Sequence, residues 1–175
     1  ATNIPLPDGR SLIVGGGGGV ILWQTGLKTT EVFDPATRSF SAGPDLLQAR
    51  SSHSQTRLKD GRYLLAGGVD DKNIPTANCE IYDPKTGRFS AVSSLTYKRT
   101  FHQSILMDDG RVIVIGGFAD MGAILSAQKA LESGIAQTEI FNPATNRWTL
   151  GGRLRYGRGA PGAQNIGNGY ILVIG

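Results

Sequence analysis

The chain has 175 residues, a formal net charge of +4, 25 glycines and 8 prolines. This length allows one domain with a buried core, and the glycine and proline content suits a fold with many tight turns. The apolar runs are too short for a membrane-spanning helix, and the single cysteine, Cys79, excludes a disulfide within the chain.

The basic residues recur at fixed places and do not form one patch. Nine of the eighteen lysines and arginines fall in three columns of a repeat: Arg10, Arg62 and Arg111; Arg38, Arg88 and Arg147; and Arg50, Arg99 and Arg158. Residues that recur once per unit serve the unit more often than a shared surface, and no basic run with interleaved aromatic residues occurs. We therefore predict no nucleic-acid partner and no membrane partner.

The first half of each unit, which is about fifty residues long, predicts a β-hairpin. Turn pairs recur as Asp8-Gly9, Asp60-Gly61, Asp109-Gly110 and Asn168-Gly169. Such pairs favour two-residue hairpin turns because both central residues can take positive φ. After each pair comes a short apolar strand that ends in glycine: 11–16, 63–68, 112–117 and 171–175.

The second half of each unit predicts another hairpin. A Glu-apolar-aromatic-Asp/Asn-Pro motif occupies residues 31–35, 80–84 and 139–143, and an aromatic residue follows each proline by five positions: Phe40, Phe89 and Trp148. Proline and the preceding Asp or Asn favour a turn between a third and a fourth strand. Four antiparallel strands per unit are typical of a β-propeller blade.

Together these motifs resemble the Kelch repeat. The resemblance rests on the Gly-Gly pair, the aromatic residue before Asp-Pro and the aromatic residue beyond it, and the Leu-x-Asp-Gly-Arg variant is similar to bacterial Kelch repeats. It implies an all-β, Kelch-type β-propeller over residues 1–175, with about three and a half four-stranded antiparallel blades. The expected blades are 2–40, 52–91, 101–150 and a half blade at 160–175. The resemblance also favours a secreted or periplasmic location.

A ring of the Kelch type has six or seven blades, so three and a half blades predict further partners. One interpretation is that the chain is a portion of a longer propeller, whose remaining blades complete the ring. The other is that a second copy of the chain completes it, although the half blade then finds no third and fourth strands. Open edge strands favour association in either case.

The binding face is predicted to carry the loops between the second and third strands and the links between blades. These segments vary between units, and loops carry function more often than scaffolds do. The longest, 118–137, has a rough helical spacing that Gly134 could cap, as a packed helix or as a lid. The candidate binding residues on this face are Trp23, Asp70, Asp71, Lys72, Tyr97, Arg99, Phe118 and Tyr156.

The repeat argues against a catalytic role for its own charged residues. His53 and His102 occupy one column, as an Arg-x-x-His motif that degenerates to Arg158 and Pro161. A hydrogen-bonding role in the core is therefore favoured over a catalytic or metal site. Buried contacts between the arginine column and the glutamate column (Glu31, Glu80, Glu139) would explain why both kinds of residue recur in each unit. No catalytic residue, metal ligand or cofactor is predicted, and the favoured function is binding or scaffolding of a protein or carbohydrate partner.

The alternative function is an enzyme. Residues 43–50 and 60–62 resemble part of the propeller of the galactose oxidase family, which implies a copper-radical oxidase or another carbohydrate-active enzyme. That family needs a tyrosine cross-linked to a cysteine from the preceding blade. His53 stands near the place expected for the tyrosine, and Cys79 lies in a third strand, so the resemblance does not supply the copper ligands.

Overall fold

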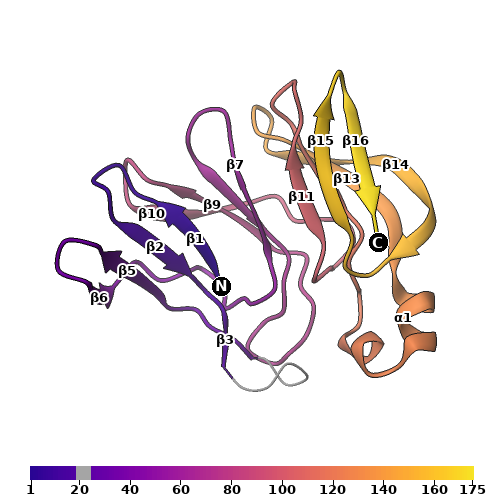
Figure 1. Cartoon of the computed structure of the whole chain (residues 1–175), viewed down its shortest axis with the longest axis horizontal. Helices are drawn as coiled ribbons and strands as arrows, with labels where there is room; N and C mark the ends of the chain where they lie inside the picture. Colours follow the sequence, from indigo (N-terminus) through magenta and orange to yellow (C-terminus); the bar gives the residue numbers. More distant parts are fainter. Residues whose placement is uncertain (19–24) are drawn as a thin grey trace.

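The computed structural model describes residues 1–18 and 25–175 and is built from antiparallel sheets with very little helix (Figure 1). Sheet one has the order β1-β2-β5-β6: β1 (Thr2–Pro5), β2 (Ser11–Val14), β5 (Thr30–Asp34) and β6 (Ser39–Ala42). Sheet two has the order β7-β8-β9-β10: β7 (Ser54–Arg57), β8 (Tyr63–Ala66), β9 (Cys79–Asp83) and β10 (Arg88–Val92). The all-β prediction is confirmed.

Two further sheets follow in the chain. Sheet three has the order β11-β12-β13-β14: β11 (Gln103–Leu106), β12 (Val112–Ile115), β13 (Ile135–Asn142) and β14 (Arg147–Arg158). A two-stranded sheet comprises β15 (Gly162–Gly167) and β16 (Tyr170–Ile174). A small ladder joins β3 (Gly17–Gly18) to β4 (Thr25–Gly26).

The Asp-Gly turns differ from the prediction. In the first, the Gly9 amide donates to the Leu6 carbonyl and the Leu6 amide to the Arg10 carbonyl, which encloses three loop residues. Positive φ is taken by Gly9 alone, at 88°, while the Asp8 side chain accepts the Arg10 amide. The second and third turns have the same hydrogen bonds. The two-residue turn with positive φ at both positions occurs at Asn168-Gly169.

The turns between third and fourth strands follow the predicted chemistry. Asp34 Oδ1 accepts the Ala36 amide at 2.8 Å, and Asp83 and Asn142 bind the equivalent amides. Across each hairpin the recurring aromatic side chains stack in tilted pairs: Phe33 with Phe40, Tyr82 with Phe89, and Phe141 with Trp148. In each sheet, the repeated motif therefore stabilises the hairpin of the third and fourth strands in two ways, through the Asp or Asn turn and through the aromatic pair.

The apolar core lies between neighbouring sheets. One cluster joins sheets one and two: Ile4, Leu12, Val14, Val32, Leu46, Tyr63, Leu65 and Tyr82. A second joins sheets two and three: Leu58, Leu64, Ala66, Cys79, Ile81, Leu95, Val112, Val114 and Phe141. Sheet two therefore buries both of its faces, as expected for a unit with a neighbour on each side.

The first strands of successive sheets lie side by side (Figure 1). Gln55 Nε2 in β7 donates to the Asn3 carbonyl in β1 at 2.8 Å, the hydroxyls of Thr56 and Ser104 bond at 2.5 Å, and Asn165 Nδ2 donates to the Leu106 carbonyl at 3.2 Å. Each four-stranded sheet therefore extends away from this row of first strands, toward its own fourth strand.

The loops and links meet on one side, as the strand order predicts. Leu27 bridges to Arg50, Ser51 to Val69, and Thr100 to Phe118. The predicted helical insertion forms η2 (Met121–Leu125) and α1 (Ala127–Ser133), on the same side as β3 in Figure 1. None of the helices in the described part of the chain is long and apolar enough to cross a membrane.

Gly134 ends α1 without the left-handed conformation of a helix-capping glycine, because its φ is −61°. A Cβ atom at this position would lie only 2.8 Å from the carbonyl carbon of Gly157 in β14. Glycine is therefore needed here for close approach of two backbones.

Candidate functional site

Two fully buried arginines join neighbouring sheets. Arg50 Nη2 donates to Glu80 Oε1 at 2.7 Å, and Arg99 Nη2 donates to Glu139 Oε1 at 2.9 Å. The Nη1 group of each arginine donates to a glycine carbonyl, Gly67 for Arg50 and Gly116 for Arg99. The predicted contact between the arginine and glutamate columns is confirmed, and burial explains it because buried charges need partners.

The same glutamates also hold the backbone of the links. Glu80 accepts the amides of Leu47 and Gln48 at 2.8 and 3.2 Å, and Glu139 accepts those of Thr96 and Tyr97 at 2.6 and 3.1 Å. We name these contacts the first junction (Arg50 with Glu80) and the second junction (Arg99 with Glu139). The carboxylates and the Nη atoms are therefore bonded within the fold, although the Nε atoms of Arg50 and Arg99 are buried without a partner, and we regard the junctions as structural elements.

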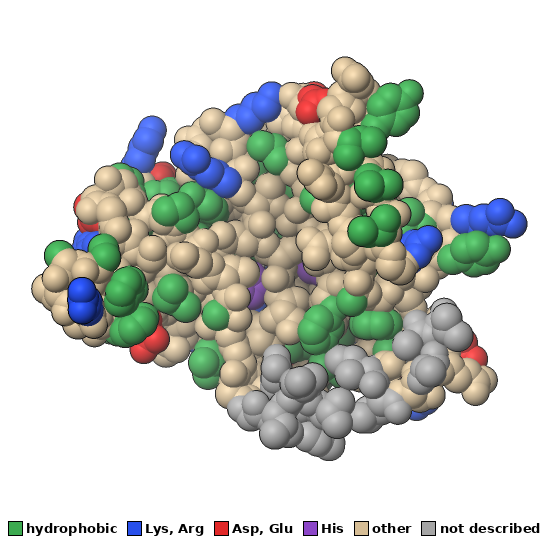
Figure 2. Space-filling view, viewed as in Figure 1, with side chains coloured by type: hydrophobic (Ala, Val, Ile, Leu, Met, Phe, Trp, Pro, Cys, Tyr) green, Lys and Arg blue, Asp and Glu red, His purple; other side chains and the backbone are tan. Residues whose placement is uncertain are grey.

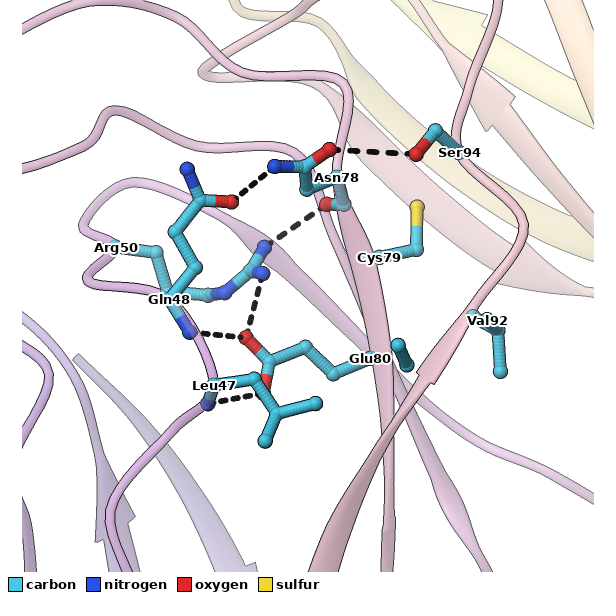
Figure 3. A pocket seen from close by; sticks show the side chains of 9 residues that line it. Leu47, Gln48, Arg50, Asn78, Cys79, Glu80, Val92 and Ser94 are labelled. Atoms are coloured by element: carbon cyan, nitrogen blue, oxygen red, sulfur yellow. Dashed lines mark hydrogen bonds and ion pairs between the residues drawn. The ribbon is translucent and has the colours of Figure 1, made fainter.

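A cavity of about 400 Å³ lies beside the first junction (Figure 3). Its lining residues are Leu47, Gln48, Arg50, Asn78, Cys79, Glu80, Ala91, Val92 and Ser94. Asn78 Nδ2 donates to Gln48 Oε1, and Ser94 Oγ donates to Asn78 Oδ1 at 3.3 Å. These bonds use both the nitrogen and the oxygen of the Asn78 amide. They connect the link that carries Gln48 to the second sheet.

Cys79 is unsuited to nucleophilic or redox chemistry. Its Sγ lies 3.5 Å from the Ala77 carbonyl, and burial raises the pKa of the thiol to about 11. A thiol with this pKa is protonated at neutral pH, and the thiolate is the reactive form.

The two histidines link the first strands of adjoining sheets. His53 Nε2 bonds the Thr2 hydroxyl at 2.9 Å, and His102 Nε2 bonds the Ser54 hydroxyl at 2.8 Å. Burial lowers the pKa of His102 to about 3 and lowers the pKa of His53 well below 6.5, so both rings are neutral at pH 7. The predicted core hydrogen-bonding role is confirmed.

A hollow of about 310 Å³ opens where the links enter the first strands. We call it the link pocket; it is lined by Ser52, His53, Phe101, His102, Gln103, Ala160 and Pro161. Figure 2 shows the histidine side chains recessed near the middle of the face in view. Ser52 and Phe101 have φ values of 50° and 55°. Such values are rare for bulky residues, and backbone strain of this kind concentrates at functional sites.

The predicted binding residues do not converge on one site. Asp70 organises its own loop, since its Oδ1 accepts the amides of Lys72 and Ile74 at 2.9 Å, while Asp71 and Lys72 are exposed. Arg99 is buried in the second junction. Trp23 lies outside the described residues.

The predicted aromatic residues have three different environments. Tyr97 is partly exposed beside the second junction, and Tyr156 is exposed with the Arg155 guanidinium 5.3 Å from its ring centroid. The Phe118 ring fills the space over Gly159, where a Cβ atom would overlap it. Phe118 is therefore a packing residue of the third sheet.

The link-pocket residues Ser52, Phe101 and Gln103 were not singled out from the sequence. The signal that could have found Ser52 and Phe101 is the position two after each periodic arginine, which holds Ser52, Phe101 and Ala160. A varying residue between two repeated ones indicates a place that the repeat itself does not constrain.

The comparisons with known proteins concern the fold. No family model matches the chain, and no curated protein matches it in sequence. Among solved structures, the chain is similar to a novel fungal alcohol oxidase of the AA5 family, in complex with copper, with a TM-score of 0.58 and 20% identity. The match covers 85% of this chain and 31% of the oxidase, so the chain spans less than a third of that protein.

A copper ion like that of the oxidase does not fit the residues described here. The Nε2 atoms of both histidines are bonded to hydroxyls, and Cys79 lies in the cavity beside the first junction, bonded to a carbonyl. Among residues 1–18 and 25–175, no group of three or more His, Cys, Asp or Glu side chains could hold a metal ion. We therefore derive no copper chemistry from these side chains.

Proposed function

We propose that the chain is a segment of a Kelch-type β-propeller that acts as a binding module, with the link pocket as its ligand site. Three consecutive four-stranded sheets with adjacent first strands support the propeller, as does the fold shared with the oxidase. The ligand class that fits the pocket is a small neutral carbohydrate. A protein partner would instead use the wider loop face, including the exposed side chains of Tyr97 and Tyr156.

The observation that carries this proposal is the uncharged lining of the link pocket. Ser52, Phe101 and Gln103 line it, and the two histidines are neutral at pH 7. Polar and apolar atoms line this shallow hollow in similar proportion, which suits a ligand that presents both hydroxyl groups and a ring face. A volume of about 310 Å³ suits a ligand the size of a sugar ring.

The strained backbone supports the same site. A left-handed conformation costs about 1–2 kcal/mol for a residue with a side chain. Ser52 and Phe101 both take it, directly before the periodic histidines. Such strain persists where the surrounding structure holds it, and it directs these two residues to the rim of the pocket.

The test is titration calorimetry with a panel of neutral mono- and disaccharides. We expect saturable binding that Phe101→Ala and Gln103→Ala each weaken about tenfold or more, because each removes a contact to the ligand. Lys85→Ala, on an exposed outer turn, is the matched control and should bind as the parent does. Absence of saturable binding, or equal binding by all variants, would contradict the carbohydrate site. Binding of a protein partner that depends on Tyr97 and Tyr156 would instead support the loop face as the binding site.

The alternative is the propeller portion of a galactose-oxidase-like copper-radical oxidase or of another carbohydrate-active enzyme. The likeness to a copper-bound alcohol oxidase favours it. Because the described side chains do not make a copper site, residues beyond this chain would have to supply the ligands. Titration with Cu(II) of the longer protein that this alternative requires, followed by electron paramagnetic resonance, separates the two proposals. One tightly bound ion per molecule of that longer protein would favour the oxidase.

A further inference from the structure

The β15–β16 sheet has the pattern of an inner hairpin but half the strands of the other sheets. The second strands β2, β8 and β12 are each paired on both sides. Within the described chain, β16 pairs with β15 alone. Its apolar residues Tyr170, Leu172 and Ile174 lie on one face of this sheet and are 69%, 48% and 61% exposed, so that face is uncovered. A strand edge without a partner is a template for pairing with a further strand.

Arg158 stands beside this edge in the position of the two junction arginines. Its carbonyl accepts the Gly117 amide at 2.8 Å, as the Arg50 carbonyl accepts the Gly16 amide and the Arg99 carbonyl the Gly68 amide. Its guanidinium has no hydrogen bond or ion pair with any residue of 1–18 or 25–175, and the side chain is half-buried. Arg158 therefore has the backbone placement of a junction arginine without a carboxylate.

We propose that the open edge of β16, together with Arg158, docks a β-hairpin of the same repeat type, whose first strand carries Glu-apolar-aromatic-Asp/Asn-Pro. The partner is defined by this chemistry. Its strand would add antiparallel to β16, and its glutamate would bond the Arg158 guanidinium to form a third junction. Strand addition supplies main-chain hydrogen bonds, and the buried ion pair supplies specificity.

The three complete sheets set the register of the added strand. Glu31, Glu80 and Glu139 pair across from Ile13, Leu65 and Val114, each two residues before the first glycine of a Gly-Gly pair. The equivalent residue of β16 is Val173. We therefore place the partner's glutamate opposite Val173 and its aromatic residue opposite Ile171.

A second folded copy of the chain does not fit this edge. The motif strands of the chain, β5, β9 and β13, are each already paired on both sides within their own sheets. None of them can be offered to β16 without unfolding a sheet. A hairpin that has not been incorporated in another sheet is the occupant that the geometry requires.

The test uses a fluorescently labelled peptide with the sequence of residues 136–150, which contains one such hairpin and no cysteine. We expect saturable binding to the chain, measured by fluorescence anisotropy. Glu139→Gln in the peptide and Arg158→Gln in the protein should each weaken binding about tenfold or more, and together little further, because both remove the same ion pair. Arg153→Gln, an exposed neighbour in β14, should leave binding unchanged.

Hydrogen exchange locates the peptide. Protection should increase at the amides of β16. Protection confined to other strands, absence of saturable binding, or equal binding by the Glu139→Gln peptide would each overturn the proposal. Concentration-dependent self-association that Arg158→Gln abolishes would also overturn it, because the edge would then be occupied by a second copy.

Discussion

The first and second junctions share one set of contacts but differ in what surrounds them. At the first, Asn78 and Cys79 precede the glutamate, and a cavity of about 400 Å³ lies alongside. At the second, the equivalent residues, Gln137 and Thr138, bond the backbone of β14. Gln137 Nε2 donates to the Gly151 carbonyl at 2.8 Å, and Thr138 Oγ1 to the Gly152 carbonyl at 2.5 Å. The repeat thus specifies the ion pair, whereas the residues beside it differ between the two junctions.

The largest effect is expected from removing the better enclosed arginine. Arg99→Met leaves Glu139 fully buried without its cationic partner and should lower the free energy of unfolding by about 3–5 kcal/mol. Urea denaturation followed by circular dichroism measures the loss. The double variant Arg99→Met/Glu139→Leu should recover much of it. Failure to recover would mean that the loss does not come mainly from the unpaired charge, because the double variant also removes the bonds from Glu139 to the amides of Thr96 and Tyr97.

The first junction should tolerate the same change better. Arg50→Met exposes Glu80 to the adjoining cavity, where water can solvate the carboxylate, so we expect a loss about 1 kcal/mol smaller than for Arg99→Met. The same urea titration gives the difference. Equal losses would show that the cavity does not hydrate the junction.

The histidines extend the comparison to pH. The unfolded chain protonates His102 near pH 6.5, whereas in the folded chain burial lowers its pKa to about 3. The free energy of unfolding should therefore decrease as the pH falls from 6.5 toward 3, by up to about 1.4 kcal/mol per pH unit for this residue. Urea titrations of the parent and of His102→Gln test this. The variant should have the shallower slope, and unchanged slopes would contradict a buried neutral His102.

The links that carry the two arginines store strain at equivalent places. Ser52→Gly removes the cost of the left-handed conformation in the folded chain, but it also gives the unfolded chain more conformational freedom. We expect the first effect to be larger, so that the free energy of unfolding rises by about 0.5 kcal/mol. Ser41→Gly, in the exposed strand β6, is the matched control and should destabilise by about the same amount. A loss at Ser52 would mean that its side chain contributes more than its strain costs.

The smallest effect is expected at the exposed ion pairs of the turns. Arg62 lies 2.8 Å from Asp60, but both side chains are well exposed. Arg62→Ala should lower the unfolding free energy by less than about 1 kcal/mol, and 0.5 M salt should reduce the difference. A loss comparable to that of Arg50→Met would remove the distinction between buried junctions and surface pairs.

The sequence was most informative where residues recur. The columns of arginine, glutamate and histidine predicted buried contacts, because a charge that returns once per unit needs a partner in the unit beside it. The strands followed from the turn pairs and the aromatic pairs. The turn geometry was predicted incorrectly at Asp8-Gly9 and its two equivalents, since a three-residue loop needs positive φ at glycine alone.

The candidate site was largely hidden from the sequence. The positive φ of Ser52 and Phe101, and the pocket that they border, depend on how successive links stack, and no local pattern encodes that. Tyr156 and Asp70 attracted attention because they lie outside the repeat, yet Asp70 serves its own loop. The predicted binding residues and the link pocket lie at different places among the loops and links, and both remain predictions.

The junctions also give the array a direction. Each one joins two unlike surfaces, an arginine-bearing link behind and a glutamate-bearing strand ahead, so the contact is heterologous. Two units cannot exchange equivalent contacts about a twofold axis through such a junction. Every added unit must follow the preceding one with the same sense of rotation. Successive rotations then produce a closed ring if they sum to a full turn, and an open spiral if they do not.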